Sequence, residues 1–448
     1  MATLYDELEL VRGELDRCMK CGNCMAVCPV YITGKSEAGV ARGKIALAES
    51  ILSGEIGLDD EDVAQRLFNC LVCKSCMRSC PSGVNFDRIM LSLRAAIVRK
   101  KGVPAVKRFI FGSLKRQRVF DAGMRIGAAV QGLAFRRRPD GDTCSPRFPL
   151  GLELRRVLPR MKAATFRRSV PERIAAHEQK TAVAFFTGCS INYLYPGVGH
   201  DILEVLKENS IMTIIPAGQH CCGMAVLAHG DVATARKMAR SNIDTFGRTG
   251  AAYIITACGS CGATWQREYG ELLQDDVLYR EKAEYWSKRT YDISTFLTKI
   301  VDYRRPRGRV EGVVTYHDSC HLKKTMGVYN EPRAILQAIP RMEFREMAKP
   351  DACCGGGGSY SITHYSMAVE IGKRKSADID ATRADTVASG CPACMMHLLD
   401  LTARFGKGQK IVHYITLLAE SYRREKSEPN PGMERTGWRS PSPMSCHS

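Results

Sequence analysis

The sequence predicts a multidomain α+β and α/β protein, in which a mostly helical N-terminal domain precedes two repeated parallel α/β domains. Two dense cysteine runs lie within the first 100 residues, and five later cysteines recur at a nearly constant offset. Strand-like and helix-like segments alternate around the recurring cysteines, which is typical of parallel sheets. The predicted divisions are 1–100, a basic helical connector over 101–178, repeats over 179–305 and 306–424, and a disordered tail over 425–448.

The N-terminal cysteine runs read "CMKCGNCMAVCP" and "CLVCKSCMRSCP". Each follows the bacterial ferredoxin spacing C-x2-C-x2-C-x3-C-P, in which the fourth cysteine ligates the other cluster. Two complete copies of this pattern favour two cubane [4Fe-4S] clusters over zinc or a set of disulfides. Between the runs, residues 36–55 have helical spacing. The predicted ligands of the first cluster are Cys18, Cys21, Cys24 and Cys80, and those of the second are Cys70, Cys73, Cys76 and Cys28.

The formal net charge of +18 is concentrated in the connector, where residues 99–170 carry 19 Lys and Arg against four Asp and Glu. This concentration argues against a general nucleic-acid-binding surface and favours docking to an acidic partner or anionic lipid headgroups, with a solvated linker as the alternative. We expect amphipathic helices here whose apolar residues pack on the C-terminal domain, and a loop over 136–149 in which Cys144 is incidental. The apolar residues concerned are Phe109, Ile110, Leu114, Val119, Phe120, Met124 and Ile126.

The opening residues and the short apolar runs of the sequence favour a cytoplasmic protein. The opening "MATLYDELEL" is acidic and amphipathic rather than a secretory signal, and no apolar run approaches the ~18 residues of a membrane span. In that compartment thiols stay reduced, so clustered cysteines more often bind metal than form disulfides. Peripheral attachment to the inner face of the membrane, through the connector, stays open.

The C-terminal half repeats itself with little slippage. Corresponding cysteines are offset by 131 to 133 residues, which indicates an internal duplication. Several of them follow predicted strands, and the carboxyl ends of parallel strands meet at one edge of a sheet. Each set of five is therefore expected to converge. The first set is Cys189, Cys221, Cys222, Cys258 and Cys261, and the second is Cys320, Cys353, Cys354, Cys391 and Cys394.

Five thiolates exceed the four ligands of a structural zinc, and adjacent cysteines are poorly placed to form a disulfide. An iron-sulfur cluster with an additional or bridging thiolate uses all five. Zinc in at least one copy and unmetallated thiols remain alternatives. His220, His317 and His321 adjoin these cysteines and either hydrogen-bond to cluster sulfur, donate protons or are ordinary polar residues, and Asp318 is placed to orient a histidine. The glycines of "CCGGGGSY" suggest that the Cys353 and Cys354 site is the roomier one.

These motifs resemble the CCG-domain family, whose pattern of Cys, Cys-Cys and Cys-x2-Cys occurs twice behind a two-cluster ferredoxin module. The resemblance covers nearly the whole chain and is closest to the glycolate oxidase iron-sulfur subunit, with the D subunit of heterodisulfide reductase and the C subunit of glycerol-3-phosphate dehydrogenase as relatives. It implies an electron-transfer subunit of a flavin-dependent glycolate or lactate dehydrogenase, which works beside an FAD-binding subunit and delivers electrons toward quinone.

Some glycolate oxidase subunits lack one cysteine of each Cys-x2-Cys pair, whereas this sequence keeps all four, as heterodisulfide reductases do. The alternative function is therefore a thiol-disulfide oxidoreductase with catalytic non-cubane clusters. One or two further [4Fe-4S] clusters are expected at the repeats. The sequence has no G-x-G-x-x-G between a strand and a helix, so no FAD or NAD site is predicted, and no catalytic residue is assigned.

Overall fold

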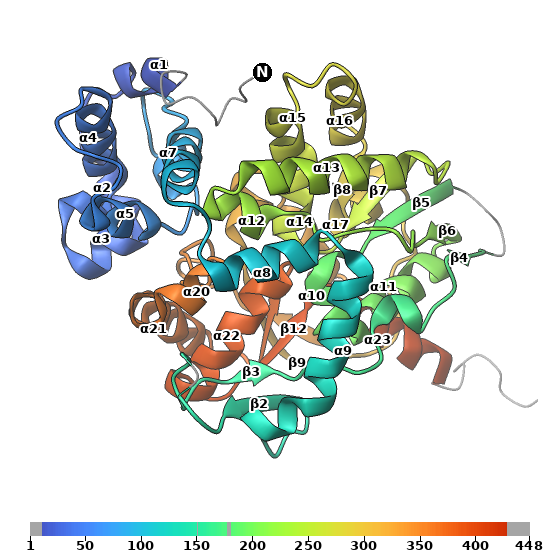
Figure 1. The fold of residues 1–448 in the computed structure, drawn as a ribbon. Coiled ribbons are helices and arrows are strands. Elements are labelled where there is room, and N and C mark those ends of the chain that lie inside the picture. The colour runs from blue at the N-terminus through green and yellow to red at the C-terminus, as the bar shows by residue number, and fades with distance from the viewer. Residues whose placement is uncertain (1–10, 150, 177–180, 428–448) are drawn as a thin grey trace, which may run out of the picture.

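A computed structural model describes residues 11–149, 151–176 and 181–427. An N-terminal helical module leads through the connector into two α/β repeats that pack against one another (Figure 1). The predicted fold class is confirmed. No helix within the described residues is long and apolar enough to cross a bilayer.

The helical module is built from short helices around the two cysteine runs. The expected helix between the runs is present as α4, whose Ile45 is buried. Asp60 caps α5 by accepting hydrogen bonds from the backbone N–H groups of Asp62 and Val63. The helices are α1 (Arg12–Asp16), α2 (Asn23–Val27), α3 (Pro29–Gly34), α4 (Ala41–Leu52), α5 (Glu61–Phe68), α6 (Ser75–Arg78) and α7 (Phe86–Lys101).

The connector forms α8 (Ala105–Leu114), α9 (Gln117–Ala134) and a small antiparallel sheet of β1 (Phe135–Arg137), β2 (Thr143–Pro146) and β3 (Leu158–Pro159). The loop expected over 136–149 is therefore wrong in part. Asp140 accepts hydrogen bonds from the backbone of Asp142 and Thr143, which closes a turn between β1 and β2. Cys144 is buried within β2.

The apolar residues of the connector do not pack as expected. Leu114 is buried, and Phe120 and Met124 are partly buried. In contrast, the Phe109 side chain is 77% exposed and Ile126 is 64% exposed. The expectation that this apolar face covers the C-terminal domain is wrong for four residues, which are Phe109, Ile110, Val119 and Ile126.

The first repeat is a five-stranded sheet in the order β4-β6-β5-β7-β8, in which only β4 is antiparallel. Its strands are β4 (Arg173–Ile174), β5 (Thr181–Phe186), β6 (Ile211–Ile214), β7 (Tyr253–Thr256) and β8 (Thr290–Asp292). The helices include α10 (Gly188–Tyr193), α11 (Pro196–Glu208), α12 (Met224–His229), α13 (Val232–Gly247), α14 (Gly259–Ala263), α15 (Tyr269–Leu272), α16 (Arg280–Ser287) and α17 (Ile293–Thr295).

The second repeat has the parallel order β10-β9-β11-β12, which matches β6-β5-β7-β8 of the first. Its strands are β9 (Gly312–His317), β10 (Met342–Phe344), β11 (Thr386–Ser389) and β12 (Lys410–His413). Its helices are α18 (Cys320–Lys324), α19 (Asn330–Gln337), α20 (Tyr360–Thr363), α21 (Tyr365–Thr382), α22 (Pro392–Phe405) and α23 (Tyr414–Ser427).

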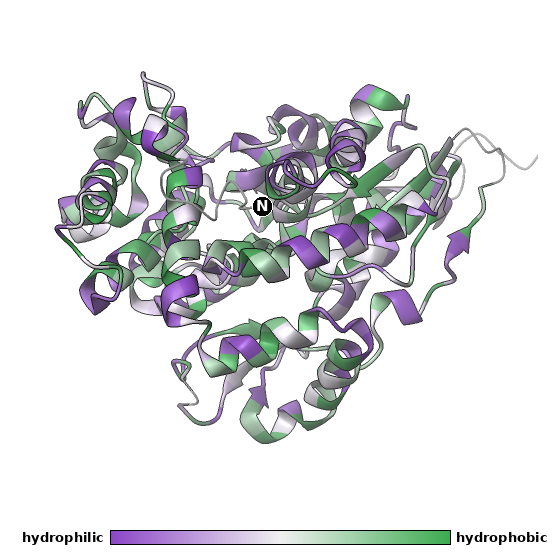
Figure 2. Cartoon of the chain, turned by 45° about the horizontal axis from the view of Figure 1, so that its top comes forward, coloured by the Kyte–Doolittle hydropathy of each residue, from purple (hydrophilic) through white to green (hydrophobic). Residues whose placement is uncertain are grey.

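One hydrophobic core joins the two repeats. It contains Phe185 and Ile255 of the first sheet together with Val314 and Ala388 of the second. Figure 2 shows hydrophobic strands in the interior, whereas the surface helices alternate between hydrophobic and hydrophilic residues. Because both sheets share this core, their strand ends are held in a fixed relation to each other.

Candidate metal centres

The ferredoxin-type cysteines line two neighbouring cavities of the helical module. One cavity is lined by Cys18, Cys21, Cys24 and Cys80, together with residues of α4. Cys76 also reaches this cavity, although it belongs to the second cysteine run. The structure therefore brings together the four residues that the sequence assigns to the first cluster.

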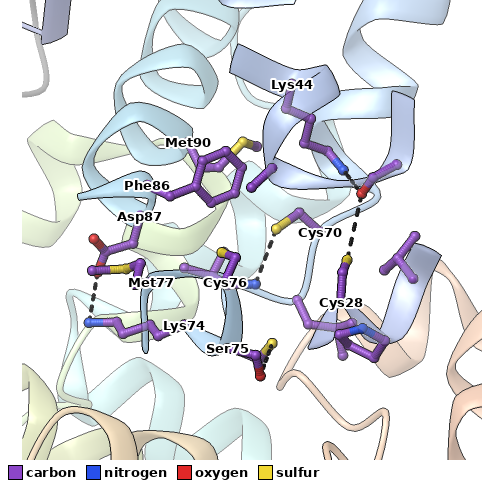
Figure 3. Close-up of a pocket in the computed structure, with 17 residues that line it drawn as sticks. Cys28, Lys44, Cys70, Lys74, Ser75, Cys76, Met77, Phe86, Asp87 and Met90 are labelled. Carbon is purple, nitrogen blue, oxygen red and sulfur yellow. Dashed lines mark hydrogen bonds and ion pairs between the residues drawn. The ribbon is translucent and has the colours of Figure 1, made fainter. Parts of the chain in front are cut away.

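The second cavity is lined by Cys28, Cys70, Cys73 and Cys76 (Figure 3). The backbone N–H of Val72 donates to the Cys70 sulfur at 3.5 Å. Lys44 is buried and donates to the backbone carbonyl of Asn69 at 3.1 Å, which places an ammonium group near these thiols. Four cysteines that can ligate iron, a backbone N–H that can hydrogen-bond to sulfur and a buried ammonium group together fit an anionic iron-sulfur cluster.

A buried ion pair fixes this cavity against the first repeat. The Lys74 ammonium lies 2.8 Å from Asp87 and 2.9 Å from Glu268, and all three side chains are nearly inaccessible to solvent. Lys74 lies between Cys73 and Cys76, so the ion pair holds the middle of the second cysteine run. Burial raises the pKa of Glu268 to about 7, and the Lys74 ammonium opposes that rise.

Cys73 connects the module with the second repeat. Hydrogen bonds from Cys320 and Cys353 hold the pKa of Cys73 well below its ordinary range. Nearby, the Lys324 ammonium donates to Ser75 at 2.6 Å, so the cysteine run and α18 are joined by a polar contact as well. The ferredoxin-type site and the second repeat's site therefore adjoin.

The cysteines of the first repeat converge as predicted for strand ends. Cys189 follows β5, and its sulfur lies 3.8 Å from that of Cys221. Hydrogen bonds from Cys221 and Cys261 lower the pKa of Cys222 well below its ordinary range. Cys258 lies beside Cys261 in the same group.

The cysteines of the second repeat are spread more widely. Cys320 and Cys353 lie with Cys73, whereas Cys354 and Cys394 lie beside His317, with the three donor atoms within 4.8 Å of one another. Cys391 faces the first repeat, and its sulfur is 4.0 Å from that of Cys258. The two five-cysteine groups are therefore adjacent, and they meet at the equivalent cysteines of the two Cys-x2-Cys pairs.

The three histidines have different surroundings. His220 contacts the Leu114 carbonyl at 3.3 Å through Nδ1, an ordinary polar contact. His321 contacts Ser260, whose hydroxyl is 3.9 Å from the Cys391 sulfur, and burial lowers the pKa of His321 to about 4. A ring nitrogen of His317 lies within 4.8 Å of the sulfur atoms of Cys354 and Cys394. Asp318 orients neither neighbour, because Arg333 binds it at 2.8 Å and Lys323 at 3.2 Å.

The glycine run beside Cys354 is closely packed rather than open. A Cβ on Gly355 would lie 2.3 Å from the Ala368 carbonyl oxygen, and one on Gly357 would lie 3.0 Å from the Leu71 side chain. Only Gly358 has open space around it. The glycines themselves do not open this site, because they admit neighbouring backbone and side chains instead.

A groove of about 700 Å³ nevertheless reaches Cys353 from the side of α2, α3 and α21. Its walls come from the helical module and from the second repeat, and they include Val27, Ile32 and Ile371. Cations dominate its charged lining, which consists of Arg78, Lys323, Lys324, Lys349, Arg374 and Lys375 against Asp351 and Asp378.

Three residues near the thiols were not singled out from the sequence. His397 faces Cys354 across the close-packed Gly355 and Gly356, Ser260 contacts Cys391, and Lys74 anchors the second cysteine run. The repeat alignment offers a signal for His397 only, because it occupies the position of Thr264 in the first copy. Local sequence does not reveal the contacts that Ser260 and Lys74 make across domains.

Family models match both parts of the chain. One described as "Cysteine-rich domain" matches residues 183–266 and 314–399, and one described as "4Fe-4S dicluster domain" matches residues 14–84. The dicluster match supports [4Fe-4S] clusters in the N-terminal module, and the first model matches once in each α/β repeat.

Two curated relatives match nearly the whole chain, and a third matches about half of it. The probable glycolate oxidase iron-sulfur subunit of Bacillus subtilis is 32% identical over 426 residues, covering 91% of this chain and 94% of the relative. The D subunit of the dihydromethanophenazine:CoB--CoM heterodisulfide reductase of Methanosarcina barkeri is 26% identical over 435 residues, covering 91% and 94%. Lactate utilization protein A of Halalkalibacterium halodurans is 29% identical over 236 residues, covering 53% and 96%.

The first two of these relatives are named as subunits of oxidoreductases, and each of them matches this chain across its dicluster module and its two cysteine-rich repeats. The chain belongs to the family of CCG-domain iron-sulfur proteins that contains the probable glycolate oxidase iron-sulfur subunit of Bacillus subtilis.

Proposed function

We propose that this chain is the electron-transfer subunit of a flavin-dependent 2-hydroxyacid dehydrogenase of the glycolate or lactate type. A partner subunit would bind FAD and oxidise the hydroxy acid, and this chain would carry the electrons toward a quinone or another carrier. The similarity to the Bacillus subtilis and Halalkalibacterium halodurans proteins supports this substrate class.

One observation carries the proposal: the thiols form a continuous series through the molecule. Exposed Cys21 opens the first cavity, and Cys76 lines both cavities. Cys73 then meets Cys320 and Cys353. The series continues across the repeats where Cys391 and Cys258 approach within 4.0 Å. Iron-sulfur clusters held by these thiols would supply one-electron storage and transfer.

Residues around this series of cysteines fix the positions of the thiols and exclude water from them. The Lys74 ion pair ties the module to the first repeat, and Lys324 ties it to the second. Trp265, Phe186 and Phe246 pack around the thiols of the first repeat and exclude water there. A fixed and water-excluding path suits electron transfer better than hydroxyacid oxidation, which needs a two-electron acceptor.

Anaerobic purification with metal and sulfide analysis tests the occupants. Clusters at all four sites predict about sixteen iron atoms per chain, four per cluster, whereas about eight iron atoms with zinc would contradict a complete series. Co-purification of an FAD protein, together with glycolate- or lactate-dependent dye reduction by the complex, would support the dehydrogenase assignment.

A second function is favoured by the complete cysteine set of both repeats. Cys258, Cys261, Cys391 and Cys394 are all present and buried or partly buried near other thiols. In this alternative the chain is a thiol-disulfide oxidoreductase, as in the heterodisulfide reductase relatives. Disulfide reduction by the purified chain with a reduced dye, without any flavoprotein, would favour it over the first proposal.

We also propose that the connector docks the protein onto an anionic membrane surface, where a quinone would be dissolved. On α8 and α9 the side chains of Val106, Phe109 and Leu133 are 73%, 77% and 76% exposed. Exposed basic residues lie on the same two helices and in the turn between them: Arg108 on α8, Arg118 and Arg125 on α9, and Lys115 and Arg116 in the turn. Exposed apolar side chains among basic ones are typical of interfacial helices, which bind acidic headgroups while the apolar groups enter the lipid.

Co-sedimentation with vesicles tests this surface. The protein should bind vesicles that contain phosphatidylglycerol and bind pure phosphatidylcholine vesicles far less, and Phe109→Ser with Leu133→Ser should weaken the binding roughly tenfold or more. Val277→Ser with Leu278→Ser is the matched control, since these side chains are 81% and 73% exposed on the loop before α16. Equal losses in both double variants, or no binding by the wild type, would refute lipid docking.

A further inference from the structure

The two repeats place different residues against their thiols at one equivalent position. His317 ends β9 three residues before Cys320, and Phe186 ends β5 three residues before Cys189. Phe186 packs against Phe246 and Trp265 in the first repeat. The two repeats therefore share the fold but differ at this position, where the first has a hydrocarbon ring and the second an imidazole.

His317 is buried beside cysteine thiols. Its side chain has no solvent exposure, and among the described residues no nitrogen or oxygen atom hydrogen-bonds to Nδ1 or Nε2, so that the ring interacts with the Cys354 thiol instead. Buried polar groups are nearly always paired, so a buried imidazole whose nitrogens meet only thiol sulfur is suited to bind a metal together with those thiols. The groups that it faces are the sulfur atoms of Cys354 and Cys394, within 4.8 Å.

Two of the remaining cysteines of the second repeat are directed elsewhere. Cys320 and Cys353 lie with Cys73, whereas Cys391 lies between Cys394 and Cys258 of the first repeat. Cys354 thus has one thiol neighbour, Cys394, whereas its counterpart Cys222 in the first repeat has two, Cys221 and Cys261. A nitrogen donor at His317 makes up for this deficit.

We propose that His317 is a ligand of the second repeat's iron-sulfur centre and binds iron through an imidazole nitrogen beside the thiolates of Cys354 and Cys394. The second centre is then of mixed thiolate and imidazole type, whereas the first is ligated by thiolates alone. A neutral imidazole leaves less negative charge on the centre than a thiolate does, so the second centre should have the higher reduction potential. This inference rests on the proposed iron-sulfur occupancy, which metal analysis tests separately.

Pulsed electron paramagnetic resonance on the anaerobically purified, partly reduced full chain tests the ligand. Protein grown with ¹⁵N-histidine should show a strong nitrogen hyperfine coupling. Its size should differ from that in the ¹⁴N protein by the ratio of the magnetogyric ratios of the two nuclei. His317→Phe, which introduces the residue of the first repeat, should abolish this coupling and lower the potential of one centre while the iron count changes little. His317→Ala provides the same test without the larger ring.

His397→Thr is the matched control, because it removes another buried imidazole near Cys354 and also introduces the residue of the first repeat. The coupling should persist in this variant. The absence of a histidine nitrogen coupling in the wild type, its survival in His317→Ala, or zinc in place of iron at this centre would each overturn the proposal. Iron content and dye reduction by the complex report on the general electron-transfer function, so failure of the ligand assignment leaves that function testable.

Discussion

The glycine that follows each adjacent cysteine pair has the same backbone conformation but different surroundings. Gly223 and Gly355 both have φ of +88°, which an L side chain adopts only with strain. A Cβ on Gly223 would find its nearest neighbour at 3.8 Å, whereas one on Gly355 would lie 2.3 Å from the Ala368 carbonyl oxygen. The positive φ therefore favours glycine in both repeats, and the close approach of the Ala368 carbonyl adds a second requirement for glycine in the second repeat.

We expect Gly223→Ala to cost about 1–2 kcal/mol of stability through backbone strain, and Gly355→Ala to cost roughly 1–3 kcal/mol more because α21 must move. Anaerobic urea unfolding of the two variants measures the difference. If both variants unfold at the same urea concentration, the close approach of α21 does not restrict position 355.

Lys74 illustrates how a buried charge joins domains. Removing its ammonium leaves Asp87 and Glu268 buried, with Arg267 at 3.2 Å from Asp87 as the remaining cation. Lys74→Met should therefore destabilise the protein by about 3–5 kcal/mol. Lys282→Met should cost less than about 1 kcal/mol, since Lys282 and Asp244 are 3.9 Å apart and partly exposed.

Urea unfolding of the Lys74→Met and Lys282→Met variants, with iron content determined in parallel, checks this prediction. Adding Glu268→Gln to Lys74→Met should recover part of the loss, because it removes one uncompensated charge. A loss that Glu268→Gln does not reduce would indicate that Lys74 acts on the cysteine run rather than through the ion pair.

Between elements, one carboxyl group connects the two repeats. Asp292 at the end of β8 accepts hydrogen bonds from the Tyr414 hydroxyl at 2.7 Å and from the Ser294 backbone at 2.9 Å. Its side chain is fully buried, and burial raises the pKa of Asp292 to about 6 despite these hydrogen bonds. Tyr414 begins α23, so the contact spans the junction of the sheets.

Because the folded-state pKa of Asp292 is raised, its contribution to stability is complete below pH ~4 and is lost as the pH rises through about 6. Asp292→Asn should remove this dependence, so the stability difference between wild type and variant should change by about 1 kcal/mol between pH 5 and 7. Unfolding curves of both proteins, measured across that pH range, test this prediction. If the stability of the wild type and that of the variant depend on pH in the same way, Asp292 does not titrate in this range.

The repeat architecture could be predicted from sequence because hydrophobic strands, helices and cysteines recur together. The helix α4 and the parallel pairing of strands in both repeats followed from the same local patterns, whereas the antiparallel β4 was not predicted. The exposure of Phe109 and Ile126 could not be predicted from sequence, since apolar spacing shows which side of a helix is hydrophobic but not whether another element covers it. The meeting of Cys73 with Cys353 depends on domain docking, which no local pattern specifies.

Across the whole molecule, the module and the second repeat together form the basic groove that reaches Cys353. Its two carboxylates are already paired, Asp351 with Lys323 at 3.3 Å and Asp378 with Lys375 at 3.3 Å. Arg78 and Lys349 have no carboxylate within ion-pair distance among the described residues. The groove therefore presents uncompensated positive charge next to a thiol of the series.

A groove with this charge should attract anionic electron acceptors. We expect the reduced protein to transfer electrons to ferricyanide faster than to a cationic acceptor of similar potential at low salt, and Arg78→Glu with Lys349→Glu should slow the ferricyanide reaction roughly threefold to tenfold. Stopped-flow oxidation at low and high salt measures both rates, and the effect should disappear at high ionic strength because exposed charges are screened there. Lys407→Glu with Lys410→Glu changes the net charge equally at exposed positions in the loop before β12 and at the first residue of β12. An equal slowing in that control would mean that net charge, rather than the groove, governs acceptor approach.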